Sequence, residues 1–312
     1  MILCCGEALI DFIPTPDGEA YQPCPGGSIL NIAVGLGRMQ VPVRFLSRLS
    51  LDIFGDQLAQ HLTLNGVKLD YCPRVAGQTT LAFVKLSQDD NAEPEYAFYA
   101  EGAVDREMQV SDLPQTIDEV QALHFGSISL LLEPGASALE ALMMRESRRR
   151  VISLDPNVRP TLIDDQVAYR ERFEKWVSAV DILRLSTVDF DFIYPNANFE
   201  TMLPRWFEGG LSLAILTRGE EGAAGYLPDG TKAEAKPPKI TVADTVGAGD
   251  TFLSAALTYL YEHHLLDASV NISAMGAGHL SDCLAFAVKA AAINCTRKGA
   301  NPPTRSEMDA AL

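Results

Sequence analysis

The pattern of hydrophobic and polar positions predicts alternating strands and helices from about residue 120 to the C-terminus. Short, continuous apolar runs, typical of strands buried on both faces, are separated by longer stretches of helical period. The predicted strands are Ala122–Phe125, Val151–Leu154, Ile182–Leu185 and Leu213–Leu216, and the predicted helices are Pro134–Arg148, Asp165–Ala179, Asn198–Glu208, residues 249–262 and residues 279–296. Such alternation predicts an α/β fold with a parallel sheet that helices cover on both faces.

The first third of the chain has a more mixed pattern. Its predicted strands are residues 1–5, Val43–Leu46 and Leu69–Cys72, and Asn65-Gly66 closes a predicted helix over Asp52–Leu64. Ser28 is predicted to cap a further helix with an apolar face. Residues 79–86 and 96–99 flank a polar turn at 87–94 and predict a hairpin, although two ordinary core strands would give the same pattern. The interval before Pro25 is rich in proline and predicts turns.

Polar motifs follow three of the predicted strands directly. They are Asp155-Pro156-Asn157-Val158-Arg159-Pro160, Ser186-Thr187-Val188-Asp189 and Thr217-Arg218-Gly219-Glu220-Glu221-Gly222. Ligands of parallel sheets bind beyond the carboxyl ends of the strands. We therefore expect these three motifs to meet at one binding edge.

Composition and charge limit the classes of partner. The chain has 312 residues, is 47% hydrophobic and carries a net charge of −16. This length predicts one domain over residues 1–312, and the negative charge argues against nucleic acid or an anionic membrane as a partner. There is no long apolar segment, and Glu7 and Asp11 come too early for a signal peptide. The six cysteines show no zinc or disulfide spacing, so we expect free thiols and a cytoplasmic protein.

The most informative stretch is Asp244-Thr245-Val246-Gly247-Ala248-Gly249-Asp250, which precedes an apolar run of helical period. Free N–H groups and the helix dipole make a glycine-rich helix start a site for anions. Asp250 beside such a site could accept a proton from an attacking hydroxyl, although an aspartate there could equally be an ordinary cap. The whole string resembles the second signature of the PfkB/ribokinase family of sugar and nucleoside kinases.

A second segment carries the same resemblance. Gly26 and Gly27 precede a helix whose first turn contains Asn31, and Asp11 lies upstream. The resemblance implies that these four residues contact sugar hydroxyls. It also implies a ribokinase-like three-layer α/β/α sandwich with a mostly parallel central sheet. Strands from about residues 12–25 and 72–101 would form a small β lid that closes over the sugar and pairs between subunits of a homodimer.

The resemblance assigns roles to the motifs at the strand ends. Arg159 would lie near the transferred phosphoryl group and Asn157 near the substrate. The residues implied for nucleotide binding are Ser186, Thr217, Gly219, Gly222 and Thr245.

Two metal positions are implied. Ser186-x-x-Asp189 replaces the Asn-x-x-Glu of many relatives, so Asp189 would handle Mg²⁺ through water, with Asp191 and Glu200 as alternatives. Asp244 and the loop at 296–300 would lie near a monovalent cation, for which K⁺ is a candidate.

The implied reaction is transfer of the γ-phosphoryl group of MgATP to a hexose hydroxyl. Asp250 would be the base, and the backbone of Gly247, Ala248 and Gly249 would form the anion hole. No Gly-x-x-x-x-Gly-Lys-Ser/Thr occurs, which excludes a P-loop mechanism, and no Gly-x-Gly-x-x-Gly follows the first strand, which argues against a Rossmann dehydrogenase.

Three segments resemble those of fructokinases: residues 79–84, Phe98-Tyr99 and residues 155–160. Many fructokinases and 2-keto-3-deoxygluconate kinases have arginine where this chain has Ala100, which favours a neutral hexose. Arg106 or Arg159 could still bind a substrate carboxylate, so a 2-keto-3-deoxygluconate kinase remains an alternative. A catalytically silent sugar-binding protein of the same fold is another.

Overall fold

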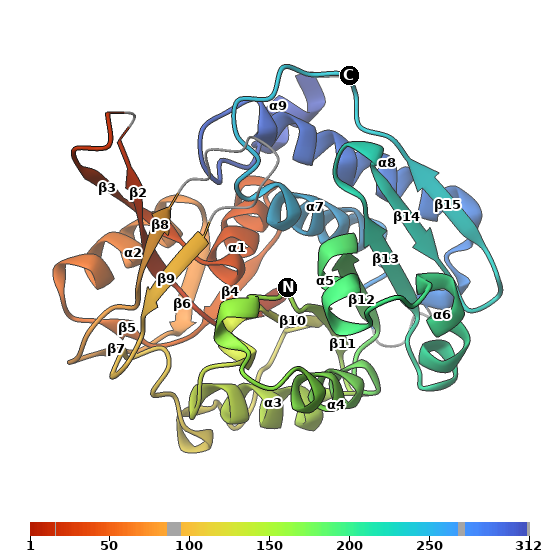
Figure 1. Cartoon of the computed structure of the whole chain (residues 1–312). Coiled ribbons are helices and arrows are strands. Elements are labelled where there is room, and N and C mark those ends of the chain that lie inside the picture. Colours follow the sequence, from red (N-terminus) through yellow and green to blue (C-terminus); the bar gives the residue numbers. More distant parts are fainter. Residues whose placement is uncertain (16, 86–94, 268–271, 311–312) are drawn as a thin grey trace.

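The computed structural model describes residues 1–15, 17–85, 95–267 and 272–310. Nine of the described strands form a central sheet (Figure 1). The order is β15-β14-β13-β12-β11-β10-β1-β4-β6. The strands are β1 Ile2–Cys5, β4 Val43–Leu46, β6 Val67–Tyr71, β10 Ala122–Gly126, β11 Val151–Asp155, β12 Ile182–Ser186, β13 Leu213–Thr217, β14 Ala223–Tyr226 and β15 Lys232–Ala235. Pairing is parallel from β6 to β13 and antiparallel for β14 and β15. The predicted parallel sheet is confirmed.

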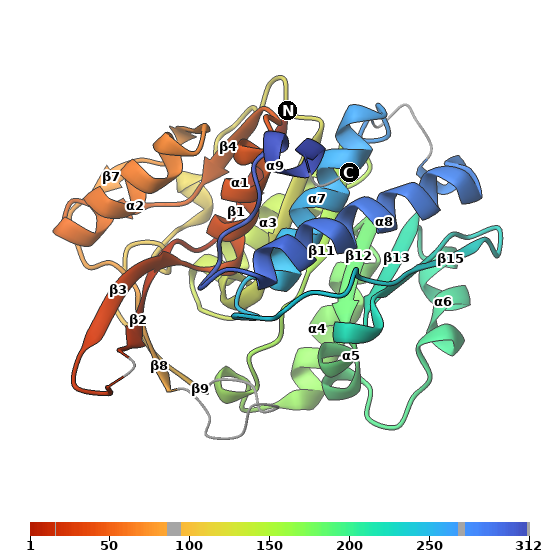
Figure 2. The same ribbon diagram turned by 90° about the horizontal axis from the view of Figure 1, so that it is seen from above.

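Helices cover both faces of this sheet, as Figures 1 and 2 show. One face carries α1 Ser28–Arg38, α2 Ile53–Leu64, α7 Ala248–Glu262, α8 Gly276–Cys295 and α9 Arg305–Ala310, and the other carries α3 Gly135–Glu146, α4 Gln166–Val177, α5 Thr187–Ile193 and α6 Phe199–Glu208. Successive side chains of a strand point to opposite faces. Ile2 of β1 therefore packs in the core that contains Leu253 of α7, whereas Leu3 packs in the core that contains Trp176 of α4. The result is the three-layer α/β/α sandwich.

A second sheet has the order β3-β2-β8-β9 and extends from one end of the sandwich (Figure 1). Its strands are β2 Leu9–Pro14, β3 Tyr21–Gly26, β8 Leu81–Lys85 and β9 Glu95–Tyr99. The turn predicted at 87–94 lies outside the described residues. The interval before Pro25, for which the prolines predicted turns and the resemblance predicted lid strands, contains parts of the hairpin of β2 and β3. Pro23 and Pro25 fit there because β3 is an edge strand, where a missing N–H can face away from the sheet.

Other boundaries differ modestly from the prediction. The strand expected at Leu69–Cys72 begins at Val67, and α8 begins at Gly276. The short helix α5 and strands β14 and β15 were not predicted. The remaining short elements are β5 Leu49–Ser50, which pairs with β7 Arg74–Val75, and the 3₁₀ turns η1 Val110–Asp112, η2 Ser127–Leu130, η3 Pro160–Leu162, η4 Gly219–Glu221 and η5 Ile272–Ala274. None of the described helices is long and apolar enough to cross a membrane.

Candidate active site

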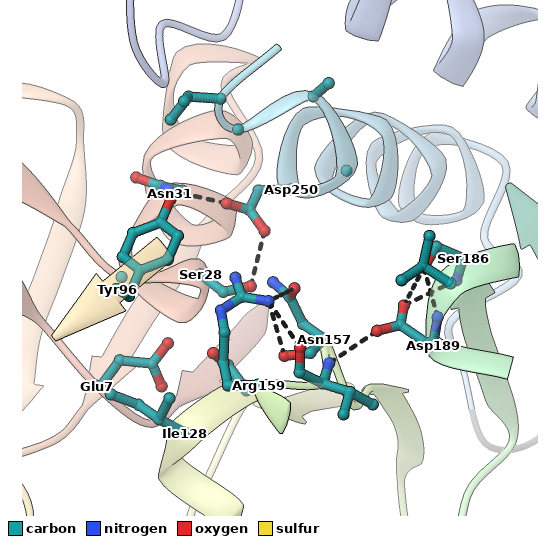
Figure 3. Close-up of a pocket in the computed structure, with 18 of the residues that line it drawn as sticks. Glu7, Ser28, Asn31, Tyr96, Ile128, Asn157, Arg159, Ser186, Asp189 and Asp250 are labelled. Atoms are coloured by element: carbon teal, nitrogen blue, oxygen red, sulfur yellow. Dashed lines mark hydrogen bonds between the residues drawn. The ribbon is translucent and has the colours of Figure 1, made fainter. Parts of the chain in front are cut away.

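A cavity of about 420 Å³ lies where the carboxyl ends of the parallel strands face the N-terminus of α7 (Figure 3). Its volume is within the range of small-ligand sites. The wall includes segments that follow β1, β10, β11 and β12, together with Tyr96 and Phe98 of the small sheet. Predicted site residues on this wall are Asp11, Gly27, Asn31, Asn157, Arg159, Ser186, Asp189, Thr245, Gly247, Ala248, Gly249 and Asp250.

Asp250 is buried in the first turn of α7 and is held by two donors from α1 (Figure 3). Ser28 Oγ donates to its Oδ1 atom at 2.7 Å, and Asn31 Nδ2 donates to its Oδ2 atom at 2.8 Å. Burial raises the pKa of Asp250 above its usual value, and the bonds from Asn31 and Ser28 oppose this rise. A fixed carboxylate with a raised pKa is a stronger base than an ordinary aspartate.

The bond from Ser28 corrects the prediction that this residue is a helix cap. Gly27 is the N-cap of α1, with φ of 103°, and no side chain caps the helix. The hydroxyl of Ser28 is instead directed at a residue 222 positions away. Local sequence rules cannot detect such a partner.

The start of α7 is shaped by glycine. Gly247 is the N-cap in the left-handed region, with φ of 72°, and a Cβ there would stand 2.6 Å from Cβ of Ala300. Asp244 holds the segment that precedes α7 in place, because its carboxylate accepts from the N–H groups of Val246 and Gly299 at 3.0 and 2.8 Å. The N–H of Ala248 donates to Thr245 O at 3.2 Å, so this predicted anion-hole donor is engaged in the conformation seen.

At the end of the cavity that carries the predicted sugar contacts (the predicted sugar end), Asp11 lies directly against Gly26. A Cβ on Gly26 would collide with Asp11 Oδ2, and one on Gly27 would stand 3.0 Å from Cγ of Glu7. Gly26 does not line the cavity. Because it has no side chain, it leaves room for the carboxylate of Asp11. Burial raises the pKa of Asp11 to about 7, while the positive charge of Arg159 opposes the rise.

Arg159 points into the cavity from the loop that follows β11 (Figure 3). Its Nη1 atom donates to Oδ1 of Asn157 at 2.6 Å, and its guanidinium lies 5.7 Å from the ring centroid of Tyr96. The arginine therefore connects the sandwich to the small sheet and brings positive charge to the wall.

Ser186 and Asp189 form a capping box at the start of α5. Oδ2 of Asp189 accepts from the N–H and Oγ of Ser186, and Oδ1 accepts from the N–H of Val158 at 2.8 Å. Asp191 and Glu200 are exposed and do not line the cavity, and Glu200 binds Tyr226 and Lys232. Across the described residues, no cluster of three or more His, Cys, Asp or Glu side chains could hold a metal ion.

The structure does not bring Thr217, Gly219 and Gly222 to the cavity wall. Oγ1 of Thr217 accepts from Nη2 of Arg184 at 2.6 Å. Gly222 has φ of 93°, and a Cβ there would collide with the carbonyl of Ala235 in β15. A close approach of two strands thus explains this glycine. Their role in nucleotide binding stays a prediction.

The polar groups of the wall that sequence reasoning missed include Glu7, Ser28 and Arg184. Glu7 is 3% exposed, accepts from Ser129 Oγ, and lies 3.4 Å from the N–H of Ile29. Burial raises its pKa to about 7. The position of Glu7 just after β1, at the binding edge, was the available signal.

The family model described as pfkB family carbohydrate kinase matches residues 1–307. Over 269 residues the chain is 40% identical to "Fructokinase" of Rhizobium leguminosarum bv. trifolii, which covers 85% of this chain and 81% of that protein. It is 32% identical to "Probable fructokinase-4" of Arabidopsis thaliana, over 100% of this chain and 96% of that one. The solved structure of fructokinase with bound ATP from Xylella fastidiosa superposes with a TM-score of 0.90 at 27% identity, covering 99% and 97% of the two chains.

Proposed function

Since the chain belongs to the pfkB family of carbohydrate kinases, we propose that it transfers the γ-phosphoryl group of ATP to a hydroxyl of fructose. The protein is a phosphotransferase with a sugar acceptor. The observation that carries the proposal is the carboxylate of Asp250, held by Ser28 and Asn31 at the N-terminus of α7 inside the cavity. The fructokinase names of the relatives support fructose, and the ATP-bound neighbour supports ATP.

The proposed reaction is an in-line transfer. The sugar hydroxyl attacks the γ-phosphorus, its proton passes to Asp250, and the bond between that phosphorus and the β,γ-bridging oxygen breaks to release ADP. Gly247 and Gly249 at the start of α7 line the cavity together with Arg159, so their backbone N–H groups and its guanidinium would stabilise the charge that develops on the phosphoryl oxygens. General-base catalysis of this kind contributes roughly 10²–10⁴-fold.

The donor set fits a magnesium ion that ATP brings with it. Mg²⁺ keeps several waters and takes one or two carboxylates together with phosphate oxygens. Asp189 faces the cavity, but three protein donors occupy its oxygens, so contact through water fits better than direct ligation. The bridge between Asp244 and Gly299 is the proposed neighbourhood of K⁺.

The polar groups of the cavity favour a neutral acceptor. Arg106, the proposed alternative partner for a substrate carboxylate, donates through Nε to Glu133 O and does not line this cavity. Arg159 is engaged with Asn157, and Ala100 is buried. The second candidate is a 2-keto-3-deoxygluconate kinase, because Arg159 lines the cavity and could turn towards a substrate carboxylate.

The small sheet is the proposed lid. Tyr96 and Phe98 of β9 point to the cavity, whereas Tyr99 is 64% exposed on the opposite face, beside Phe83 and Tyr21. An exposed aromatic face supports pairing with the lid of a second copy in a homodimer. Tyr99→Lys should then lower the mass measured by light scattering from that of a dimer to that of a monomer.

We also place the protein in the cytoplasm. All six cysteines are described, and each is a free thiol, which suits a reducing compartment.

Release of ADP from MgATP, measured against fructose, glucose, ribose, 2-keto-3-deoxygluconate and adenosine, tests the proposal. A clear preference for fructose supports it. A preference for the keto-acid sugar would keep the mechanism and overturn the acceptor. No turnover with any of the five, while calorimetry still detects sugar binding, would favour a silent sugar-binding protein.

A further inference from the structure

A buried ionic cluster joins the ends of three neighbouring strands, and the mechanism above does not use it. Arg184 of β12 donates through Nη1 to Asp155 Oδ2 of β11 at 2.8 Å, and through Nη2 to Thr217 Oγ1 of β13 at 2.6 Å. Arg184 is 7% exposed and Asp155 is 0% exposed. Taking such a pair out of water costs several kcal/mol per ion, and apolar residues of similar volume are often as stable. A contribution to stability therefore does not by itself explain why the protein has this cluster.

The guanidinium of Arg184 lies against the N-terminus of α7. A Cβ on Gly249 would stand 3.0 Å from Nη2 and 3.2 Å from Nη1 of Arg184, and Arg184 is part of the cavity wall. Its Nε atom is buried without a hydrogen-bond partner among the described residues. A guanidinium has five N–H donors, so the bonds to Asp155 and Thr217 leave donors unused.

The charges around the cavity explain why a second cation would be useful. The described wall carries four carboxylates, those of Glu7, Asp11, Asp189 and Asp250, and its cationic side chains are Arg159 and Arg184. Arg159 lies towards the predicted sugar end, since it contacts Tyr96 and its positive charge opposes the rise that burial causes in the pKa of Asp11. Arg184 lies instead against Gly249, at the start of α7.

We propose that Arg184 is a positioning residue for phosphoryl transfer, whose fixed positive charge against Gly249 stabilises the negative charge that develops on the transferred group. The inference rests on the proposed kinase function. Asp155 and Thr217 hold the guanidinium, and Asp155 also accepts from the N–H of Asn157 at 3.2 Å. The cluster thus connects the start of α7 to the loop that carries Arg159.

The test compares the double variant Arg184→Met/Asp155→Asn with Arg184→Lys and wild type. The double variant removes both charges, so no buried ion is left without a counter-charge. We expect its fructose Kd to stay within about threefold, and its kcat to fall about 100-fold, which is typical for the loss of one preorganised electrostatic contact. Arg184→Lys keeps the charge and should recover most of the lost kcat. The matched control is Arg172→Met/Glu140→Gln, an ion pair on the outer helices with a 2.9 Å contact, which should leave kcat unchanged.

Two nucleotide probes separate a role in the transition state from simple binding. In the double variant, ADP with aluminium fluoride, Mg²⁺ and fructose should bind about 100-fold more weakly, while the ATP analogue AMP-PNP should lose less than about threefold. The inference is overturned if kcat stays within threefold of wild type, if both probes weaken equally, or if the double variant does not fold. A wild-type protein that phosphorylates no sugar would instead overturn the proposed function.

Discussion

Ser28 Oγ donates to Oδ1 of Asp250 at 2.7 Å and so joins the first turn of α1 to the first turn of α7 across 222 positions of sequence. Asn31, one turn further along α1, donates to the other oxygen at 2.8 Å. The helix that carries predicted sugar contacts therefore also orients the proposed base. The predicted sugar contacts and the proposed base thus belong to one structural unit.

Ser28→Ala tests this unit. Removing a donor that stabilises the charged carboxylate raises the pKa of Asp250, so the acidic limb of the kcat/KM profile should move to higher pH. We expect kcat to fall about tenfold, the size of one hydrogen bond to a charged group. Ser178→Ala removes an exposed hydroxyl that donates to Lys175 O and should change neither quantity. A pH profile identical to that of wild type would contradict the role of Ser28.

Gly247→Ala tests the shape of the helix start. Alanine at φ of 72° is strained, and its Cβ would clash with Ala300, so we expect a loss of about 2 kcal/mol in the free energy of unfolding. Gly278→Ala in α8 is the control, because a Cβ there meets nothing within 4 Å, and it should stabilise by about 0.5–1 kcal/mol. Urea unfolding measures both. Equal effects of the two substitutions would contradict the account.

Glu7→Gln tests the buried carboxyl beside Gly27. Burial raises its pKa to about 7 in the folded protein, above the usual value of 4.5, so the folded state binds more protons between these values. Its contribution to stability is complete below about pH 4.5 and is lost as the pH rises through 7.

The variant should therefore lose about 2 kcal/mol less stability than wild type between pH 5 and pH 8, measured by urea unfolding at both values. The carboxyls of Asp11 and Asp105, with pKa values raised to about 7 and about 6, keep part of the trend in both proteins. If the variant and wild type lost equal stability between pH 5 and pH 8, the assignment of a raised pKa to Glu7 would be contradicted.

Arg159→Ala and Arg106→Ala form a matched pair. Arg159 lines the cavity, so its loss should lower kcat/KM for fructose about 100-fold. Arg106 donates to Glu133 O outside this cavity, and its loss should change kcat/KM by less than about threefold. Steady-state kinetics measure both variants. A larger loss of kcat/KM in Arg106→Ala than in Arg159→Ala would contradict the account and place the acceptor site near Arg106.

Much of the fold followed from the sequence because it depends on periodic patterns. Continuous apolar strands such as Val151–Leu154, separated by helical stretches, predicted the parallel sheet, and the rule for the carboxyl edge placed Arg159 and Asp189 on the cavity wall. Asp250 followed from a long motif at a helix start. These features are local, so a single stretch of sequence contains them.

The missed features depend on contacts between distant segments. Ser28 satisfies the local rule for a cap, and only the position of α7 shows that its hydroxyl binds Asp250. Arg184 sits inside an apolar strand pattern, and its partners Asp155 and Thr217 come from neighbouring strands. Thr217 was assigned to nucleotide binding for its motif, but its hydroxyl accepts from Arg184, and Thr217 itself is not on the cavity wall.

The central claim is that Asp250 is the base of a sugar kinase, and the most direct test is the turnover of Asp250→Asn with fructose and MgATP. Asparagine keeps the size of the side chain and removes the carboxylate. We predict that kcat falls by about 10³-fold or more while the fructose Kd from calorimetry stays within about threefold. Turnover at the wild-type rate, with binding intact, would contradict the account.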